Sequence, residues 1–156
     1  PLLDHGFRGL ARAFLMPKKE HMIRKANSQD LKAVYSLLLE GISSGKVLKR
    51  SKIKLKKILK NFFVYEVGSK VIGCCSLEVY SKKLAEVRSL VVSAEHRKKG
   101  IGSQLIQKCL DEANKKGIYQ VVSVTDKCTL FGKFGFKTEL DEKQIMFKNV
   151  ALRGCD

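Results

Sequence analysis

The chain has 156 residues, a length that fits one domain with a core of its own. Its composition, 44% hydrophobic and 29% charged, is ordinary for a globular protein, and no apolar stretch approaches the ~20 residues that span a bilayer. A transmembrane protein is therefore excluded and no membrane partner is expected. The formal net charge of +16 indicates attraction to anions, such as nucleic acid, an acidic membrane surface or a phosphorylated cofactor, without choosing among them.

Residues 1–21 carry an Arg-containing apolar piece followed by Pro17, and they precede Met22. We interpret them as a leader or extension outside the fold, and residues 22–156 as a single domain. An expression leader, a fragment of an organelle-targeting peptide and an upstream extension all stay open at this point.

The cysteines are odd in number and show neither C-x-x-C nor Cys/His ligand spacing, which argues against a disulfide framework and against a zinc site. Cys74, Cys75 and Cys109 fall in predicted elements and are interpreted as small apolar core residues. The sequence thus predicts a reducing compartment, the cytoplasm, and no bound metal, with organellar targeting by residues 1–21 as the alternative.

The first part of the domain reads as a strand followed by two helices. Residues 22–26 predict the strand, and Asn27 with Asp30 predicts a capped helix that runs to about residue 40. Ser51 is placed to cap a second helix. The apolar residues of that helix recur at helical spacing: Leu55, Ile58, Leu59 and Phe62. The cations of residues 46–60, which no acidic residue interrupts, are interpreted as a solvated face.

The hydrophobic period then changes from 3.6 to 2. Residues 62–67, 70–80 and 84–92 predict three consecutive antiparallel strands joined by hairpin turns. A helix that ends at Gly117 follows them. The apolar stripe of this helix is Ile101, Leu105, Cys109 and Ala113.

Residues 119–124 predict a buried strand that must pair in parallel, because a helix connects it to the strand before. A short helix near residues 129–134 and a hairpin of residues 136–140 and 144–152 complete the domain. The predicted fold class is α+β, a layered α/β/α arrangement around a mixed, mostly antiparallel sheet with one parallel pair.

A glycine-containing turn, Arg97-Lys98-Lys99-Gly100-Ile101-Gly102, stands where the long helix begins. Unpaired backbone N–H groups and the positive end of the helix dipole make such a turn a site for phosphate. Neither the G-x-x-x-x-G-K-[ST] loop nor the G-x-G-x-x-G dinucleotide pattern is present.

The strand ending in Leu-Val-Val, the loop after it and R-x-x-G-x-G closely resemble the acyl-CoA motif of the GNAT N-acyltransferase superfamily, and the likeness extends over roughly residues 22–150. The resemblance implies acetyl-CoA as co-substrate and a motif strand that splays from its parallel neighbour at a bulge, next to the acyl-CoA site. It places Leu90, Val91 and Val92 against the pantetheine arm and acetyl group. The residues that it places around the pyrophosphate are Arg97, Lys98, Lys99, Gly100, Ile101, Gly102 and Ser103.

Transfer of an acetyl group to an amine needs a base, because only the neutral amine is nucleophilic. Glu86 is the candidate, and by the two-residue period Glu86, Arg88 and Leu90 share one face of their strand. The alternative is a Glu86–Arg88 ion pair on a solvated surface. No tyrosine follows the fifth strand to protonate the leaving thiolate, so Thr125, Cys128 and solvent are the candidates.

Residues 45–51, 71–80 and 84–92 resemble the acetyltransferase domain of bacterial N-acetylglutamate synthases. This narrower resemblance implies L-glutamate as acceptor and a step of arginine biosynthesis. It assigns Arg50, next to Ser51, to a substrate carboxylate, and Arg88 is placed to take the second carboxylate. The chain would be a short stand-alone form without the amino-acid-kinase domain, and Leu130 stands where those synthases carry an aromatic residue.

Other functions are compatible with parts of the sequence. Another small amine, an antibiotic or a protein amino group could be the acceptor, and a homodimer is a compatible assembly. A nucleic-acid-binding module would explain the charge but leaves the R-x-x-G-x-G motif unexplained. A domain that binds acetyl-CoA without chemistry is favoured by the missing tyrosine and opposed by Glu86.

Overall fold

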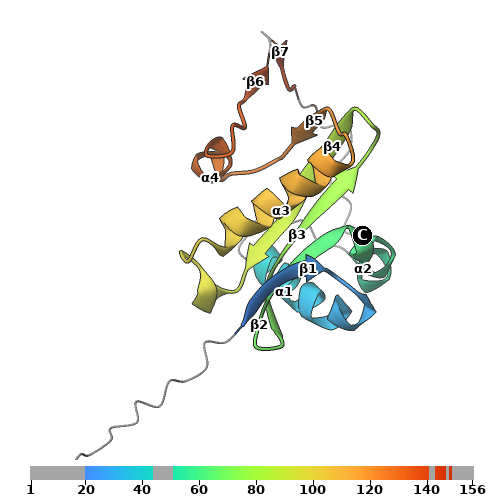
Figure 1. Cartoon of the computed structure of the whole chain (residues 1–156), viewed down its shortest axis with the longest axis vertical. Coiled ribbons are helices and arrows are strands. Elements are labelled where there is room, and N and C mark those ends of the chain that lie inside the picture. Colours follow the sequence, from blue (N-terminus) through green and yellow to red (C-terminus); the bar gives the residue numbers. More distant parts are fainter. Residues whose placement is uncertain (1–19, 44–50, 141–142, 147, 149–156) are drawn as a thin grey trace, which may run out of the picture.

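A computed structural model describes residues 20–43, 51–140, 143–146 and 148, and these form a mixed sheet with helices on both faces (Figure 1). The strands of the main sheet lie in the order β1-β2-β3-β4-β5, all antiparallel except the β4–β5 pair. Their bounds are β1 His21–Lys25, β2 Phe62–Val67, β3 Lys70–Val79, β4 Leu84–Val92 and β5 Gln120–Val122. The helices are α1 Leu31–Ser43, α2 Lys52–Ile58, α3 Ile101–Lys115 and α4 Cys128–Gly132. The predicted fold class is confirmed.

The predicted helix caps are present. The Asn27 side chain accepts from the backbone N–H of Gln29, and Asp30 accepts from the backbone N–H of Asn27 at 2.8 Å. Ser51 accepts from the backbone N–H of Lys54 at 3.2 Å. Phe62 does not extend the second helix, because the chain tightens into a 3-10 turn at Leu59–Asn61 and Phe62 then begins β2.

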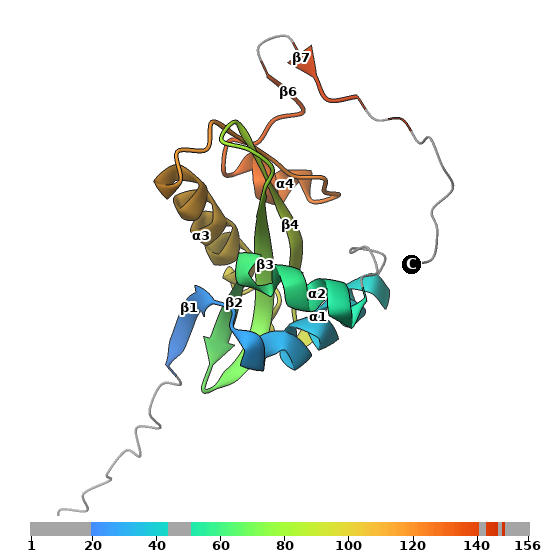
Figure 2. The same cartoon turned by 90° about the vertical axis from the view of Figure 1, so that its right-hand side faces the viewer.

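Two apolar clusters hold the layers together. One packs α3 against the sheet residues Phe63, Cys75 and Val87, and the other packs α1 and α2 against Val64 and Cys74 on the opposite face (Figure 2). The three cysteines predicted to be core residues are fully buried. Burial raises the pKa of the Cys74 thiol to about 12, so this residue remains an uncharged apolar filler.

Gly73 of β3 allows α3 to approach the sheet closely. A Cβ at this position would lie 3.2 Å from the Leu105 side chain and 3.3 Å from that of Ile101, both on the first half of α3. The glycine therefore sets the height of the α3 N-terminus over the end of β4.

A bulge in β4 changes which side chains face each helix layer. Ser89 has φ +57°, and the β3–β4 register shifts between Cys74 and Ser76. As a result Val87 lies in the α3 cluster and Val91 lies in the α1–α2 cluster. The prediction that Leu90 shares a face with Glu86 and Arg88 is wrong, since Leu90 packs on the α3 side.

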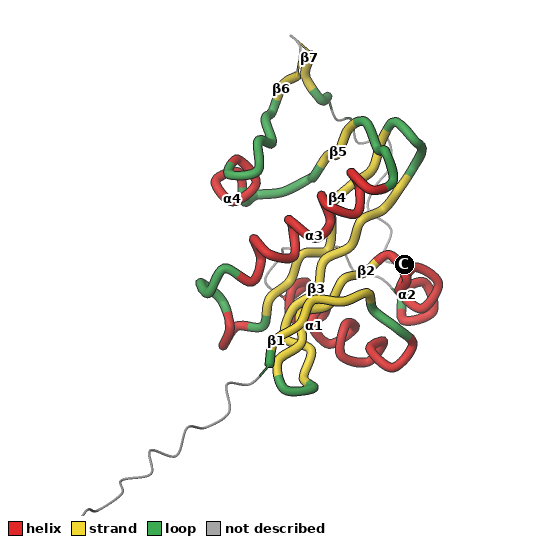
Figure 3. Tube along the Cα trace, in the orientation of Figure 1, coloured by secondary structure: helices red, strands yellow, loops and turns green. Residues whose placement is uncertain are grey.

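β4 and β5 pair over only part of their length. The parallel register joins Leu84–Glu86 to Gln120–Val122, and the Ser123 hydroxyl then donates to the Val87 carbonyl at 2.9 Å. Beyond that point β5 ends, and among the described residues β4 continues without a parallel neighbour (Figure 3). The predicted splay of the parallel pair is thus observed, and it exposes the backbone edge of the C-terminal half of β4.

The predicted C-terminal hairpin is found in part. β6 Glu139–Leu140 pairs antiparallel with β7 Lys143–Gln144, beyond the end of the sheet where β3 turns into β4 (Figures 1 and 2). Residues 149–152 of the predicted second strand lie outside the described residues. No helix within the described ranges combines the length and the apolar run that a membrane crossing requires.

Candidate active site

The glycine turn presents the first N–H groups of α3 to the surface. Gly100 is the N-cap residue of α3, has φ +76° and makes no side-chain cap hydrogen bond. The N–H of Gln104 bonds back to the Gly100 carbonyl at 3.1 Å, so the N–H groups of residues 101–103 precede the intrahelical ladder. These donors and the positive helix end can hold an anion.

The residues of the turn have distinct roles in its shape. Ile101 is buried in the α3 cluster and anchors the turn, and Lys98, with φ +60°, bends it. The side chains of Lys98 and Lys99 are exposed and add positive potential. Gly102 lies over the end of β4 and over α4, because a Cβ there would lie 3.8 Å from Leu90 and from Leu130.

A cluster of charged side chains lies near the other end of β4, where β5 ends. The Glu86 carboxylate accepts a hydrogen bond from the Tyr80 hydroxyl and lies 3.5 Å from Nη1 of Arg88. The same Arg88 nitrogen donates to Glu78 at 2.9 Å. Ala85 and Val87 face α3. The charged residues of β4 alternate with them and therefore lie on the other face of the sheet, the face that α1 and α2 cover.

Comparison with known proteins agrees with this geometry. The family model of the acetyltransferase (GNAT) domain matches residues 59–138, more than half of the chain. The chain belongs to the GNAT acetyltransferase family. It is 37% identical over 141 residues to an uncharacterized N-acetyltransferase of Chlorobaculum tepidum, covering 90% of this chain and 88% of that protein.

Two further relatives of this GNAT domain carry more specific names. An amino-acid acetyltransferase of Mycobacterium tuberculosis is 27% identical over 124 residues, which cover 77% of this chain and 70% of that protein. The structure of N-acetylglutamate synthase from Neisseria gonorrhoeae, complexed with coenzyme A and N-acetyl-glutamate, superposes with a TM-score of 0.73 at 26% identity. That match covers 80% of this chain and 30% of the synthase chain.

As a GNAT acetyltransferase, the protein uses acetyl-CoA as the acetyl donor, and its residues fit this co-substrate. The turn before α3 has free backbone donors for a pyrophosphate, and the open edge of β4 has backbone groups for an extended arm. Leu90 and Val92 are half-buried beside this edge, whereas the Val91 side chain lies in the α1–α2 cluster and leaves only its backbone for contact.

The electrostatics of the Glu86 cluster keep Arg88 charged and Tyr80 neutral. Burial acts to lower the pKa of Arg88, but the charges of Glu86 and Glu78 outweigh it and the pKa is raised. Desolvation raises the pKa of Tyr80, and the hydrogen bond to Glu86 raises it further. Tyr80 is therefore a hydrogen-bond donor at neutral pH. The cluster thus contains a carboxylate that accepts from a hydroxyl and lies beside a guanidinium.

Tyr80 is a candidate site residue that the sequence analysis did not include. The family resemblance indicates a tyrosine only in the segment after the fifth strand. The predicted strand 70–80 has a two-residue period that puts Glu78 and Tyr80 on one face, and this was the signal that could have found it.

The remaining sequence-predicted residues are placed as follows. Thr125 is half-buried in the loop after β5, where its Oγ1 accepts from the backbone N–H of Lys127 at 2.9 Å. Cys128 is exposed at the start of α4. Ser51 serves as the cap of α2, and Arg50 lies outside the described residues. Nowhere in the described part of the chain do three His, Cys, Asp or Glu side chains come together as metal ligands would.

Proposed function

We propose that this GNAT protein transfers the acetyl group of acetyl-CoA to the α-amine of L-glutamate. The observation that carries the proposal is Arg88 held between Glu78 and Glu86. A guanidinium beside carboxylates offers complementary charges to a zwitterionic amino acid, with a fork for a carboxylate and a negative group for an ammonium. The relatives named amino-acid acetyltransferase support the same acceptor class.

In this proposal the turn of residues 97–103 binds the pyrophosphate through backbone N–H groups, and residues 90–92 bind the pantetheine arm and the acetyl group. Backbone donors at the edge of β4 would polarise the thioester carbonyl and stabilise its oxyanion without reorganising. Acetyl-CoA supplies the thioester carbon that is attacked.

Glu86 is proposed as the general base. It takes a proton from the ammonium, directly or through water, and the neutral amine then attacks the thioester carbon as the carbon–sulfur bond breaks. The leaving thiolate takes a proton from solvent, and the Thr125 hydroxyl is placed as a candidate hydrogen-bond donor to it. The Thr125 oxygen already accepts from Lys127, which leaves the hydroxyl hydrogen available to donate.

The Tyr80→Phe substitution should lower kcat by up to roughly tenfold, because Tyr80 is 52% exposed and such a hydrogen bond is worth about 0.5–1.5 kcal/mol. Steady-state kinetics at saturating acetyl-CoA would measure it. Tyr119→Phe is the matched control, since that side chain is 79% exposed, and it should leave kcat unchanged. Equal rates for Tyr80→Phe and the unaltered protein would remove Tyr80 from the site.

Arg50 is proposed to bind a carboxylate of glutamate, and its replacement tests the acceptor. Arg50→Ala should raise the KM for glutamate strongly with acetyl-CoA affinity unchanged, and Arg50→Lys should not restore it, because an ammonium lacks the bidentate fork. The assay is thiol release from acetyl-CoA with glutamate. Turnover of other amines but not of glutamate, or unchanged kinetics in Arg50→Ala, would contradict the glutamate assignment.

A small cationic amine is the second candidate acceptor. Glu78 and Glu86 outnumber Arg88 in the described part of the site, so the face has a negative balance that attracts an ammonium without a carboxylate. Thiol release across a panel of amino acids, polyamines and peptides distinguishes the candidates by their kcat/KM values.

A further inference from the structure

The side chain of Arg97, the first residue of the glycine turn, points back toward the protein. Its Nε donates to the Val92 carbonyl at 3.0 Å, and its Nη2 donates to Oε1 of Glu40 at 3.2 Å. The same Glu40 oxygen accepts from the backbone N–H of Ala94 at 2.9 Å. One carboxylate of α1 therefore holds the turn at two points, 54 and 57 residues away in the chain.

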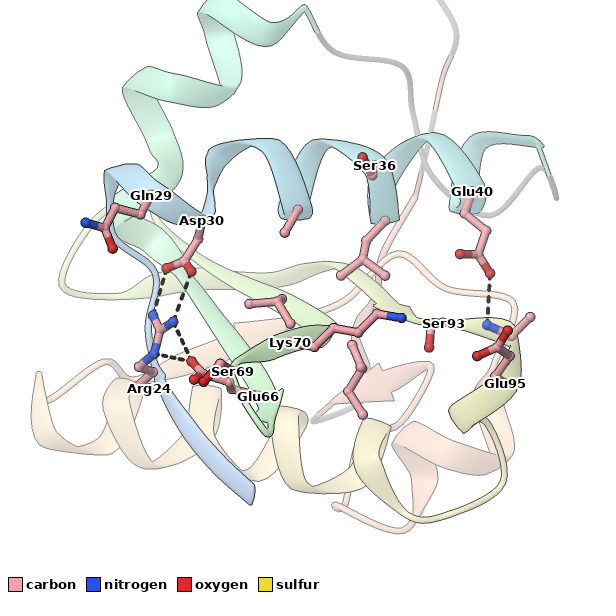
Figure 4. Close-up of a pocket in the computed structure, with 15 residues that line it drawn as sticks. Arg24, Gln29, Asp30, Ser36, Glu40, Glu66, Ser69, Lys70, Ser93 and Glu95 are labelled. Atoms are coloured by element: carbon pink, nitrogen blue, oxygen red, sulfur yellow. Dashed lines mark hydrogen bonds and ion pairs between the residues drawn. The ribbon is translucent and has the colours of Figure 1, made fainter. Parts of the chain in front are cut away.

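Figure 4 shows the hydrogen bond between Glu40 and the backbone N–H of Ala94 at one end of a pocket beneath α1. At the other end Arg24 binds Asp30 and Glu66, with its nearest contacts at 2.7 and 2.6 Å. Between these two contacts lies an open pocket of about 890 Å³ between α1, the start of β3 and residues 93–95. Because this space is not filled by side chains, apolar packing does not fix the turn against α1, and the Glu40 contacts take that role.

We propose that Glu40 is a positioning residue for acetyl-CoA binding, an inference that rests on the pyrophosphate site proposed above. Glu40 and Arg97, here called the brace, hold the 3-10 turn Ala94–His96 so that the N–H groups of residues 101–103 are arranged before the co-substrate arrives. Preorganisation strengthens binding because less conformational entropy is lost on association. Arg97 then acts through the turn and is not a direct ligand of the phosphate.

Considered only as a charge, Glu40 predicts a change in acetyl-CoA affinity opposite to the one that the brace predicts. Glu40 is a negative charge close to a site for an anion, so its removal alone would strengthen acetyl-CoA binding. The brace predicts weaker binding, because the turn becomes mobile. The two effects are thus separated by the direction of the change.

The test is acetyl-CoA affinity, measured by calorimetry, in Glu40→Ala, Glu40→Gln, Arg97→Met and the double variant Glu40→Ala/Arg97→Met. We expect Glu40→Ala to raise Kd on the order of tenfold, and Glu40→Gln to raise it less, because the amide oxygen can still accept from Ala94. Arg97→Met should raise the Kd for acetyl-CoA about as much as Glu40→Ala does. The Kd of the double variant should be little higher than that of either single variant, because each single change already breaks the same Glu40–Arg97 contact.

Glu95→Gln is the matched control. It removes an exposed carboxylate of the same turn, one that forms none of the brace contacts. The Kd of this variant for acetyl-CoA should stay equal or fall slightly. The variants should also raise the KM for acetyl-CoA with kcat at saturation nearly unchanged, a split that general destabilisation does not produce. Melting temperatures without ligand confirm that each variant is folded at the assay temperature.

The result that overturns the brace is equal or tighter binding in Glu40→Ala, or additive losses in the double variant, which would make Arg97 an independent phosphate ligand. The calorimetry needs no acceptor, so failure of the glutamate assignment would leave this test intact. A loss of binding in the Glu40 and Arg97 variants that is matched by Glu95→Gln would also reject the brace.

Discussion

Replacement of Glu86 by glutamine is expected to lower kcat by a factor on the order of 10²–10⁴, the range that general-base catalysis contributes. Glutamine keeps the size of the side chain and an oxygen that can accept the Tyr80 hydrogen bond. It cannot take a proton from the ammonium. Acetyl-CoA affinity should be unchanged, because the turn before α3 lies at the opposite end of β4. Kinetics and calorimetry on the same preparation measure the two quantities.

The pH dependence of the Glu86→Gln variant supplies a second readout. Its residual rate should rise with pH, because the fraction of free amine in solution grows and less help from a base is needed. Glu95→Gln is the control, since Glu95 is an exposed carboxylate outside this cluster, and it should leave kcat and the pH profile unchanged. A Glu86→Gln enzyme with the kcat and pH profile of the unaltered protein would reduce the Glu86–Arg88 contact to a surface ion pair.

Most of the secondary structure was predictable because hydrophobic period is a local property. The stripe of α3 buries one face, as does the alternation in β4 before its bulge, and both elements form where the sequence indicates. Phe62 was ambiguous, because an apolar residue at a helix–strand junction fits both periods. Its place in β2 follows from burial in the α1–α2 cluster, which no local pattern reveals.

The glycine turn was recognisable from sequence because its chemistry is carried by the backbone. Gly100 occupies a left-handed conformation that favours glycine, and the residues after it form the helix. The resemblance implied a bulge in this strand, but no residue marked its position at Ser89, because the positive φ of this serine accompanies the β3–β4 register shift. That bulge is why the predicted face of Leu90 was wrong.

The side-chain partners within the site depended on contacts distant in sequence. Glu40 reaches Arg97 only because α1 packs across the sheet beside the end of β4, and a charged residue late in an amphipathic helix reads as a solvated position. Tyr80 reaches Glu86 through the β3–β4 turn. The sequence thus predicted the backbone that we propose to bind the co-substrate, but not the side-chain contacts of Arg97 and Glu86.

Gly102→Glu is expected to abolish the stabilisation that acetyl-CoA gives to the folded protein. A ligand that binds only the folded state at 100 times its Kd stabilises it by about 2.7 kcal/mol, and this gain, read as a rise in melting temperature, should disappear. The glutamate would place bulk and negative charge at the start of α3, where the pyrophosphate is proposed to bind.

The fold should tolerate this change, which makes Gly102 a sharper test than Gly100. A Cβ at residue 102 meets its nearest neighbours at 3.8 Å, an ordinary contact, whereas Gly100 has φ +76° and any substitution there is strained. A carboxylate in the first turn of a helix also interacts favourably with the helix dipole, so the melting temperature without ligand should not fall for electrostatic reasons. Gly102→Ala should keep most of the acetyl-CoA affinity, and Gly102→Gln, equal in size to the glutamate variant but uncharged, should bind more tightly than Gly102→Glu. Wild-type affinity in Gly102→Glu would show that the pyrophosphate does not bind at the start of α3.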